Sequence, residues 1–284
     1  MQTLDIPVAG GTLRALRFGD GPHTVLAAHG ITASAMSFRA IARHLPPDWN
    51  LVALDLRGRC GSGDLPGPYG MSAHAADICA AADLLGPPVV LTGHSMGGYA
   101  ALRAAAKRPE LFSRLVLIDG GLPLPVPDGI DPDAATRATV GPALARLTET
   151  YQSVDDYVAF FRAHPALGPQ WTDDMDAYAR YDAVGEPGAV RSRVKAEAVT
   201  ADGRDLIVSA GSFGDDLRAL KVPALLLYAP RGMVGQVPGL MPQPLVDTWT
   251  AASSLTAELL PDCNHYTIVM GDGAAATVAA RLTA

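Results

Sequence analysis

Residues 89–98 read VVLTGHSMGG, and this stretch decides the fold class. The apolar run Val89–Thr92 predicts a short buried strand, and a helical, Ala-rich pattern continues to about Lys107. Between them, residues 93–97 fit G-x-S-x-G. A sharp strand-to-helix turn forces its central residue into a strained backbone conformation and raises that residue above the sheet, at the positive end of the helix. Ser95 is therefore a candidate nucleophile, the alternative being an ordinary glycine-rich turn with an exposed serine.

Strand and helix patterns alternate on both sides of this turn. A hairpin is predicted over Thr3–Arg17, around Gly10-Gly11. Further strand patterns occur at Thr24–Ala28, Leu51–Leu56, Leu115–Ile118, Pro223–Tyr228 and near Leu255–Leu260, and helix patterns occur at Ala35–Leu45 and Met71–Leu85, the latter with Ser72 as a plausible N-cap. Such alternation implies right-handed crossovers. We therefore predict an α/β protein with a mostly parallel central sheet flanked by helices.

The alternation stops after Asp119. Helical patterns follow at Ala143–Tyr151, Val154–Ala163 and Asp174–Tyr181, and strands resume only at Pro223. An insertion of this length is too long for a bare loop. We predict a helical lid over residues 121–219, inserted after the sixth strand, with the core formed by residues 1–120 and 220–284.

Composition and charge limit the kinds of molecule that this protein is expected to bind. The net charge is −7 and no Lys/Arg-rich run occurs, which argues against nucleic acid. No apolar run approaches the roughly 18 residues of a membrane span. Residues Met1 to Phe18 lack the layout of a signal peptide, so a cytoplasmic protein is expected. We expect a small-molecule substrate as the partner, and a monomer or homodimer.

Neither a metal nor a cofactor is expected. The three cysteines, Cys60, Cys79 and Cys263, are scattered and have no metal-ligand spacing, and no HExxH or EF-hand pattern occurs. The segment Arg57–Ser62 is glycine-rich but lacks the terminal Gly-Lys-Ser/Thr of a phosphate-binding loop, so we interpret it as a structural loop.

The chain is similar over nearly its whole length to the α/β-hydrolase superfamily, and within it to the lidded serine esterase and haloperoxidase-like branch. The similarity is carried by HG at 29–30, DLRGRCGSG at 55–63, GHSMGG at 93–98, LVLIDG at 115–120 and NHY at 264–266. The resemblance implies a serine nucleophile at Ser95. It leaves the substrate open, because this superfamily covers esterases, lactonases, thioesterases and carbon–carbon bond hydrolases.

The resemblance also places a general base and an oxyanion hole. A serine hydroxyl needs a base, and histidine titrates near neutrality. In hydrolases of this fold the base follows the last strand, where His265 lies. The oxyanion needs two N–H donors. We expect these from Met96, directly after the nucleophile, and from Ile31, in the loop after the first parallel strand.

The triad acid departs from the family pattern. It usually follows the seventh strand, yet residues 223–245 contain no Asp or Glu. Some relatives place it after the sixth strand, where Asp119 lies, and neighbouring strand ends are only about 5 Å apart. Asp119 is therefore our candidate, the alternatives being a strand-end Asp without catalytic role and a Ser–His dyad. Asp262 is too close in sequence to His265, and Asp247 is expected on a surface helix.

Candidate substrate contacts complete the set. His29 is expected below the site as a structural hydrogen-bonding residue rather than as the base. His29 is also counted among the candidate substrate contacts, together with four aromatic residues: Phe160, Trp171, Tyr178 and Tyr266. Arg231, near the usual position of the acid, could anchor a substrate carboxylate or form an internal salt bridge.

The predicted function is hydrolysis of a medium-sized hydrophobic or aromatic ester or lactone through an acyl-enzyme. A carbon–carbon bond hydrolase or a thioesterase with the same Ser–His pair is an alternative. A ligand-binding protein with vestigial catalysis is another, favoured by the missing seventh-strand acid. Dehalogenases and epoxide hydrolases of this fold are disfavoured, because they need a carboxylate where Ser95 stands.

Overall fold

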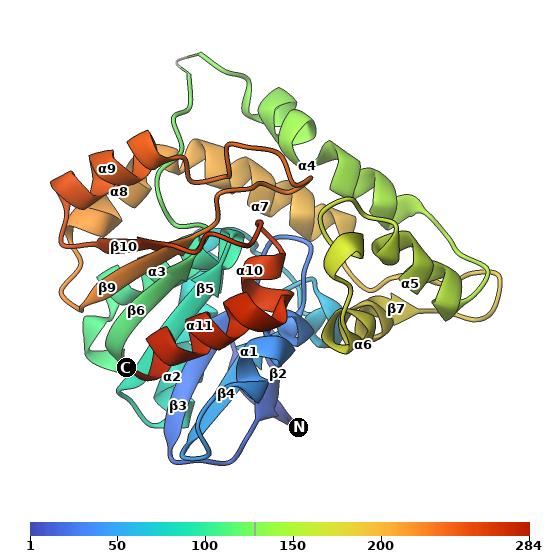
Figure 1. The fold of residues 1–284 in the computed structure, drawn as a ribbon, viewed down its shortest axis with the longest axis horizontal. Coiled ribbons are helices and arrows are strands. Elements are labelled where there is room, and N and C mark those ends of the chain that lie inside the picture. The colour runs from blue at the N-terminus through green and yellow to red at the C-terminus, as the bar shows by residue number, and fades with distance from the viewer. Residues whose placement is uncertain (128) are drawn as a thin grey trace.

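The central feature of the computed structural model, which describes residues 1–127 and 129–284, is one twisted eight-stranded sheet (Figure 1). Its strands in spatial order are β1 (Gln2–Val8), β2 (Gly11–Phe18), β4 (Trp49–Leu54), β3 (His23–Ala28), β5 (Val89–His94), β6 (Phe112–Ile118), β9 (Ala224–Tyr228) and β10 (Thr256–Leu259). The β1–β2 hairpin pairs antiparallel, β2 pairs antiparallel with β4, and all other neighbours are parallel. The predicted mostly parallel sheet is confirmed.

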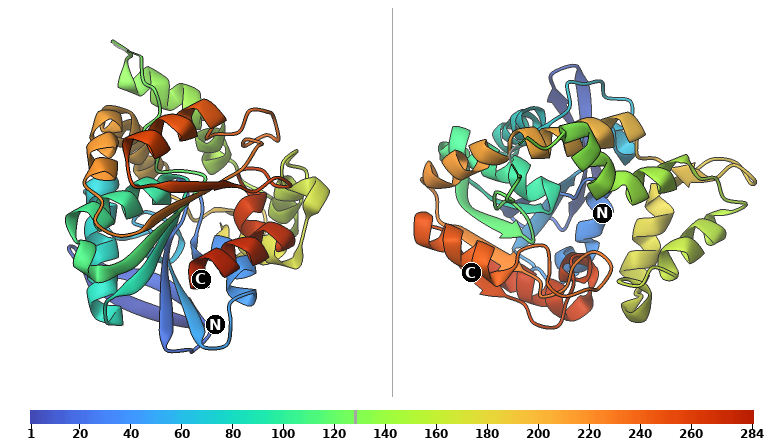
Figure 2. Two further views of the ribbon diagram at one scale, coloured as in Figure 1. Left: turned by 60° about the vertical axis from the view of Figure 1, so that its left-hand side comes forward. Right: turned by 90° about the horizontal axis from the view of Figure 1, so that it is seen from above.

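Helices cover both faces of this sheet (Figures 1 and 2). Successive strand residues point to opposite faces, so Leu91 lies in one buried core and Val90 in the other. The first core packs against α2 (Met71–Leu85), α3 (Met96–Lys107) and α8 (Ala210–Arg218), and the second packs against α1 (Arg39–Arg43), α10 (Thr267–Met270) and α11 (Asp272–Thr283). Burial on both faces explains the continuous apolar runs of the parallel strands.

The beginning of α2 corrects one local prediction. The helix spans Met71–Leu85 as predicted, but its N-cap is Gly70 and not Ser72. Gly70 has no side chain to accept a hydrogen bond, so the first N–H groups find carboxylates elsewhere. Asp202 accepts from the Gly70 N–H at 2.6 Å and Asp205 accepts from the Met71 N–H at 2.7 Å. Capping by a distant helix leaves no local sequence signal.

A helical insertion lies between β6 and β9. Its elements are α4 (Pro132–Thr148), α5 (Val154–Arg162), α6 (Asp173–Asp182), the two-residue strands β7 (Ala183–Val184) and β8 (Arg191–Ser192), α7 (Ala196–Val208) and α8. The first helix begins well before the predicted Ala143, because Asp131 caps it by accepting from the Asp133 N–H and Pro132 occupies its first position.

Most buried residues of the insertion belong to the two cores of the sheet, and a small separate cluster is formed by Val140, Val194 and Val199. Tyr157 on α5 and Tyr178 on α6 belong to the second core of the sheet. Phe213 and Leu217 on α8 belong to the first core, and α8 packs against α3. The last helix of the segment 121–219 therefore packs as part of the sheet layers, whereas α4, α5, α6 and α7 lie beyond the carboxyl ends of the strands (Figure 1).

Short elements complete the chain. They are the 3₁₀ turns η1 (Ala35–Phe38), η2 (Cys60–Ser62), η3 (Pro109–Leu111) and η4 (Gly168–Gln170), together with α9 (Gln243–Ala252). The predicted helix over Ala35–Leu45 is thus a 3₁₀ turn followed by a short α-helix. Among the helices of the described residues, none combines the length and the apolar character that crossing a bilayer requires.

Candidate active site

Ser95 sits on the turn between β5 and α3, with φ of 53° and ψ of −122°. Glycines on both sides make this turn possible. A Cβ on Gly93 would lie 2.1 Å from the Gly97 carbonyl oxygen, and a Cβ on Gly97 would lie 2.1 Å from the Ala28 carbonyl oxygen. Real Cβ atoms do not approach so closely. The strained backbone therefore places the Ser95 side chain at the carboxyl ends of the strands, as the G-x-S-x-G pattern predicts.

His265 is delivered by the loop that follows β10, directly before α10. Its Nε2 lies 3.1 Å from Ser95 Oγ, and only 2% of the residue is exposed. Hydrogen bonds hold the backbone of His265 at both its N–H group and its carbonyl. Its N–H donates to the Arg231 carbonyl at 2.9 Å, and its carbonyl accepts from His94 Nε2 at 2.8 Å. The imidazole is therefore held facing the serine.

Asp119 directly follows β6 and is fully buried. Its Oδ2 lies 2.7 Å from His265 Nδ1, and its Oδ1 accepts from the Ala229 N–H at 3.1 Å. The backbone N–H of Asp119 donates to the Leu227 carbonyl at 2.8 Å, which ties the acid to the neighbouring β9. A carboxylate at the end of the sixth strand thus reaches the imidazole, while Asp262 is exposed and Asp247 lies on α9.

Two backbone N–H groups beside Ser95 donate to no other group among the residues that the structure describes. Gly30 packs against the serine, because a Cβ built on it would lie 3.3 Å from Ser95 Cβ. Neither the next N–H, of Ile31, nor the N–H of Met96 donates a hydrogen bond within residues 1–127 and 129–284. Free N–H groups at a helix N-terminus and in the adjoining loop are what an oxyanion hole needs.

His29 lies under this loop and does not face a ligand. The residue is fully buried, its Nδ1–H donates to the Gly30 carbonyl at 2.7 Å, and its Nε2 accepts from the Leu56 N–H at 3.1 Å. Both ring nitrogens are occupied by backbone groups, so the geometry contradicts its expected place among the substrate contacts. Burial lowers the pKa of His29 to about 3.

The depressed pKa of His29 predicts acid sensitivity of the fold. Between pH 6.5 and 3 the unfolded chain binds a proton at this residue that the folded protein does not. The contribution to stability is therefore complete above pH 6.5 and is lost as the pH falls towards 3, by about 1.4 kcal/mol per pH unit. In urea titrations from pH 7 to 4.5, the free energy of unfolding of His29→Gln should fall less steeply with decreasing pH than that of the parent. His23→Gln, at an exposed histidine, should keep the parent's slope, and equal slopes for all three would contradict the expectation.

The aromatic residues expected to line the substrate divide into two groups. Tyr266 adjoins the site, with its ring 5.3 Å from that of His265. Tyr178 is buried against Phe161 in the insertion. Trp171 is half-buried beneath Arg162, and Phe160 is 42% exposed and packs on Tyr151. Phe160 and Trp171 thus stabilise the insertion, and of the four only Tyr266 adjoins the base.

Two residues, His94 and Asn264, have roles that the sequence did not indicate, and a third, Arg231, lacks within the described chain the internal salt bridge that was one of its two expected roles. His94, inside the G-x-S-x-G turn, holds the His265 carbonyl, and burial keeps its pKa well below the usual range. Asn264 accepts from the Tyr266 and Thr267 N–H groups, shaping the turn before α10. Arg231 contributes its backbone carbonyl, and among the described residues its side chain forms no ion pair. The motif NHY was visible in the sequence, but the partners of these residues were not.

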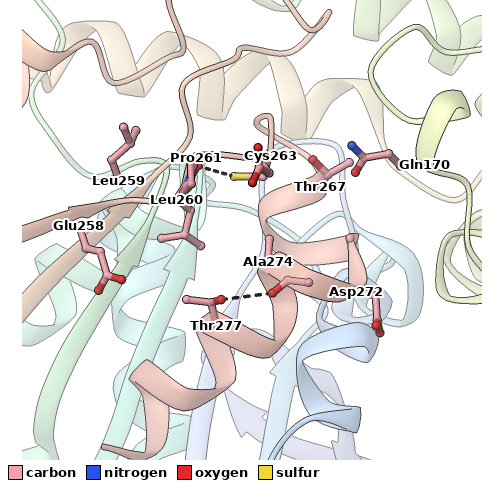
Figure 3. Close-up of a pocket in the computed structure, with 13 residues that line it drawn as sticks. Gln170, Glu258, Leu259, Leu260, Pro261, Cys263, Thr267, Asp272, Ala274 and Thr277 are labelled. Carbon is pink, nitrogen blue, oxygen red and sulfur yellow. Dashed lines mark hydrogen bonds between the residues drawn. The ribbon is translucent and has the colours of Figure 1, made fainter.

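A hollow of about 380 Å³ near the His265 loop is a separate feature (Figure 3). It is bounded by the end of β10, the loop after it and the helices α10 and α11, and neither Ser95 nor His265 lines it. Two of its polar side chains have partners. Asp272 pairs with Arg43 and His44, and Cys263 Sγ donates to the Leu260 carbonyl at 3.2 Å.

The fold agrees with a comparison against known families. Residues 25–281 match the model of the alpha/beta hydrolase family. The chain belongs to that family. This alpha/beta hydrolase is 35% identical over 139 residues to lipase LipV of Mycobacterium tuberculosis, an alignment covering 47% of the chain and 52% of the relative. It is 40% identical over 121 residues to N-formylmaleamate deformylase of Pseudomonas putida, and this alignment covers 39% of the chain and 45% of the relative. The chain thus spans about half the length of these relatives.

Among solved structures, the hydrolase is similar to E-2-(acetamidomethylene)succinate hydrolase. The TM-score is 0.81 with 20% sequence identity, and the match covers 99% of this chain and 98% of that one. At this identity the likeness concerns the fold alone. It extends over the whole sheet and the insertion, so the family architecture holds for the complete described chain.

Proposed function

We propose that this alpha/beta hydrolase is a serine hydrolase that cleaves a carboxylic ester or lactone through an acyl-enzyme. The observation that carries the proposal is the buried chain of contacts from Ser95 Oγ to His265 Nε2 at 3.1 Å and from His265 Nδ1 to Asp119 Oδ2 at 2.7 Å. A nucleophile within reach of a base, with the base oriented by a carboxylate, is the arrangement that activates a serine hydroxyl.

The proposed reaction has two steps. His265 Nε2 takes the proton of Ser95, whose Oγ attacks the ester carbonyl carbon, and the resulting oxyanion accepts hydrogen bonds from the Ile31 and Met96 N–H groups. The carbon–oxygen bond to the leaving group breaks as His265 returns the proton to that group. Water, deprotonated by His265, then attacks the acyl-enzyme and releases the acid and free Ser95. Asp119 stays ionised throughout and stabilises the imidazolium.

A hydrophobic or aromatic acyl group is the proposed substrate class. Tyr266 beside His265 offers an aromatic surface. An apolar cavity of about 220 Å³ lies between α4, α7 and α8, and Tyr99, one helical turn after Ser95, contributes to its wall. Apolar linings with few polar groups favour apolar ligand groups. The similarity to N-formylmaleamate deformylase makes a formyl amide the second candidate bond.

Covalent labelling with a substrate panel tests this proposal. The folded protein should form a fluorophosphonate adduct on Ser95, located by mass spectrometry, and should hydrolyse p-nitrophenyl esters faster than acyl-CoA, an N-formyl amide or a vinylogous diketone. Heat-denatured protein serves as the control and should not be labelled. An unlabelled folded protein would instead support a ligand-binding protein. Labelling with faster turnover of a thioester, formyl amide or diketone would reassign the bond.

A further inference from the structure

A buried arginine lies between the two residues of the proposed oxyanion hole. Arg59 is fully buried, and its Nε and Nη2 donate to the Ile31 carbonyl at 3.1 and 2.8 Å. Nη2 also lies 3.9 Å from Met96 Sδ, and Nη1 donates to the Arg57 carbonyl at 2.8 Å and to Asp202. All five N–H donors of the guanidinium are thus occupied. One side chain contacts both residues whose amides face the reacting carbonyl.

Arg59 holds one of the two peptide units that meet at Ile31, and the other carries the Ile31 N–H. A peptide unit is planar and trans, so its N–H points opposite to the preceding carbonyl. The carbonyl of Gly30, which precedes this N–H, is held by His29 Nδ1 at 2.7 Å and by the Ala33 N–H at 3.0 Å. The Ile31 carbonyl belongs to the next peptide unit, and it accepts hydrogen bonds from Arg59. The peptide that carries the Ile31 N–H and the next peptide are therefore both held, next to Gly30, which packs against Ser95.

A carboxylate on helix α7 of the insertion balances the positive charge of Arg59. Asp202 on α7 is fully buried and binds Arg59, His74 Nε2 at 2.9 Å and the Gly70 N–H at 2.6 Å. Burial raises the pKa of this carboxyl, but His74 and Arg59 outweigh that effect and lower it to about 2. The carboxylate therefore stays ionised at any working pH. A buried guanidinium needs such a partner, because an unpaired charge in the interior is strongly unfavourable.

We propose that Arg59 is a positioning residue for the oxyanion hole, and that Asp202 couples this hole to helix α7 of the insertion. The inference rests on the proposed function. It extends that function by assigning a role in transition-state stabilisation to two residues outside the Ser–His–Asp chain. It also predicts that the insertion supports turnover directly, in addition to any part it has in covering the substrate.

The test compares Arg59→Lys with Arg57→Lys. Arg57 is a matched control, because it lies two residues away, is equally buried and pairs with Asp77, Ala9 and Pro66 without contacting Ile31. Lysine keeps the positive charge beside Asp202 but cannot hold the Ile31 carbonyl through two N–H groups. We expect Arg59→Lys to lower kcat about 10- to 100-fold with KM within threefold of the parent, since small misplacements of catalytic donors have effects of this size.

Two further readouts separate positioning from general destabilisation. The rate of fluorophosphonate inactivation should fall together with kcat in Arg59→Lys, because the phosphoryl oxygen occupies the same hole. In Arg57→Lys both rates should stay within threefold of the parent, whatever its urea midpoint. Asp202→Asn should lower kcat in the same way and provides a second measurement if Arg59→Lys does not fold.

Failure of the inference is distinct from failure of the proposed function. If the parent enzyme is neither labelled nor active, the serine mechanism itself is wrong. If the parent is active and Arg59→Lys keeps more than a third of its kcat, or if Arg57→Lys loses as much, the positioning role is wrong. If Asp202→Asn is folded with the kcat of the parent, the coupling to α7 is wrong.

Discussion

Ser95→Ala should lower kcat by about five to six orders of magnitude while leaving the fold intact. The physical reason is that His265, 3.1 Å away, would have no hydroxyl to deprotonate, and only binding and the oxyanion hole would remain. An active site that has lost its nucleophile but keeps binding and the oxyanion hole still accelerates hydrolysis about 10³- to 10⁴-fold over the uncatalysed reaction in water. The measurement is ester turnover under saturating substrate, together with fluorophosphonate labelling, which should disappear completely.

Ser113→Ala is the matched control for this substitution. Ser113 lies on β6, is exposed and belongs to the same sheet, so its loss should change neither turnover nor labelling. Circular dichroism and urea unfolding should show both variants folded. Turnover of Ser95→Ala within a hundredfold of the parent would exclude Ser95 as the nucleophile.

Asp119→Asn should lower kcat by about 10⁴-fold with little change in KM. An asparagine can still accept the Ala229 N–H through its oxygen, so the backbone around β9 should be preserved. Its amide nitrogen would then face His265 Nδ1 as a donor, which favours the imidazole tautomer with the proton on Nε2. In that tautomer the nitrogen next to Ser95 has no lone pair for the serine proton.

Asp262→Asn is the appropriate control for the acid. Asp262 is exposed in the same loop as His265, and the sequence analysis excludes it as the acid because it is too close in sequence to His265. It should retain the kcat of the parent. If Asp119→Asn stayed within tenfold of the parent, the site would operate as a Ser–His dyad, and the 2.7 Å contact would be structural.

Local chemistry explains why much of the fold was predictable. The helix over Met71–Leu85 was predicted with the boundaries it has, because its apolar periodicity and the Gly86 stop are local properties. The turn around Ser95 was predictable for the same reason, since only glycine tolerates the approaches found at 93 and 97. Where the capping groups come from a distant helix, as at Gly70, the local sequence pattern indicated the wrong N-cap residue.

The candidate site was predictable in its membership but not in its contacts. Ser95 and His265 follow from motifs at fixed places in the strand order, and Asp119 follows from the absence of an acid at 223–245. The aromatic residues of the insertion were poorly predicted, because Phe160 and Trp171 look alike in a sequence whether they face a ligand or pack on a neighbour. For His29 the expected structural hydrogen bonding is found, but its grouping with the substrate contacts is wrong, because a sequence does not show whether both ring nitrogens of a histidine have partners.

The sequence by itself determined the strand and helix periodicities, the strained turn that presents Ser95 and the order in which serine, acid and histidine enter the fold. These depend on neighbouring residues and on steric rules that act over a few positions. Only the tertiary structure decided that Asp119 reaches His265, that His94 holds the histidine backbone and that Arg59 joins Ile31 to Asp202. Those contacts join residues more than 100 positions apart in most cases, and they exist because parallel strand ends and packed helices bring distant segments together.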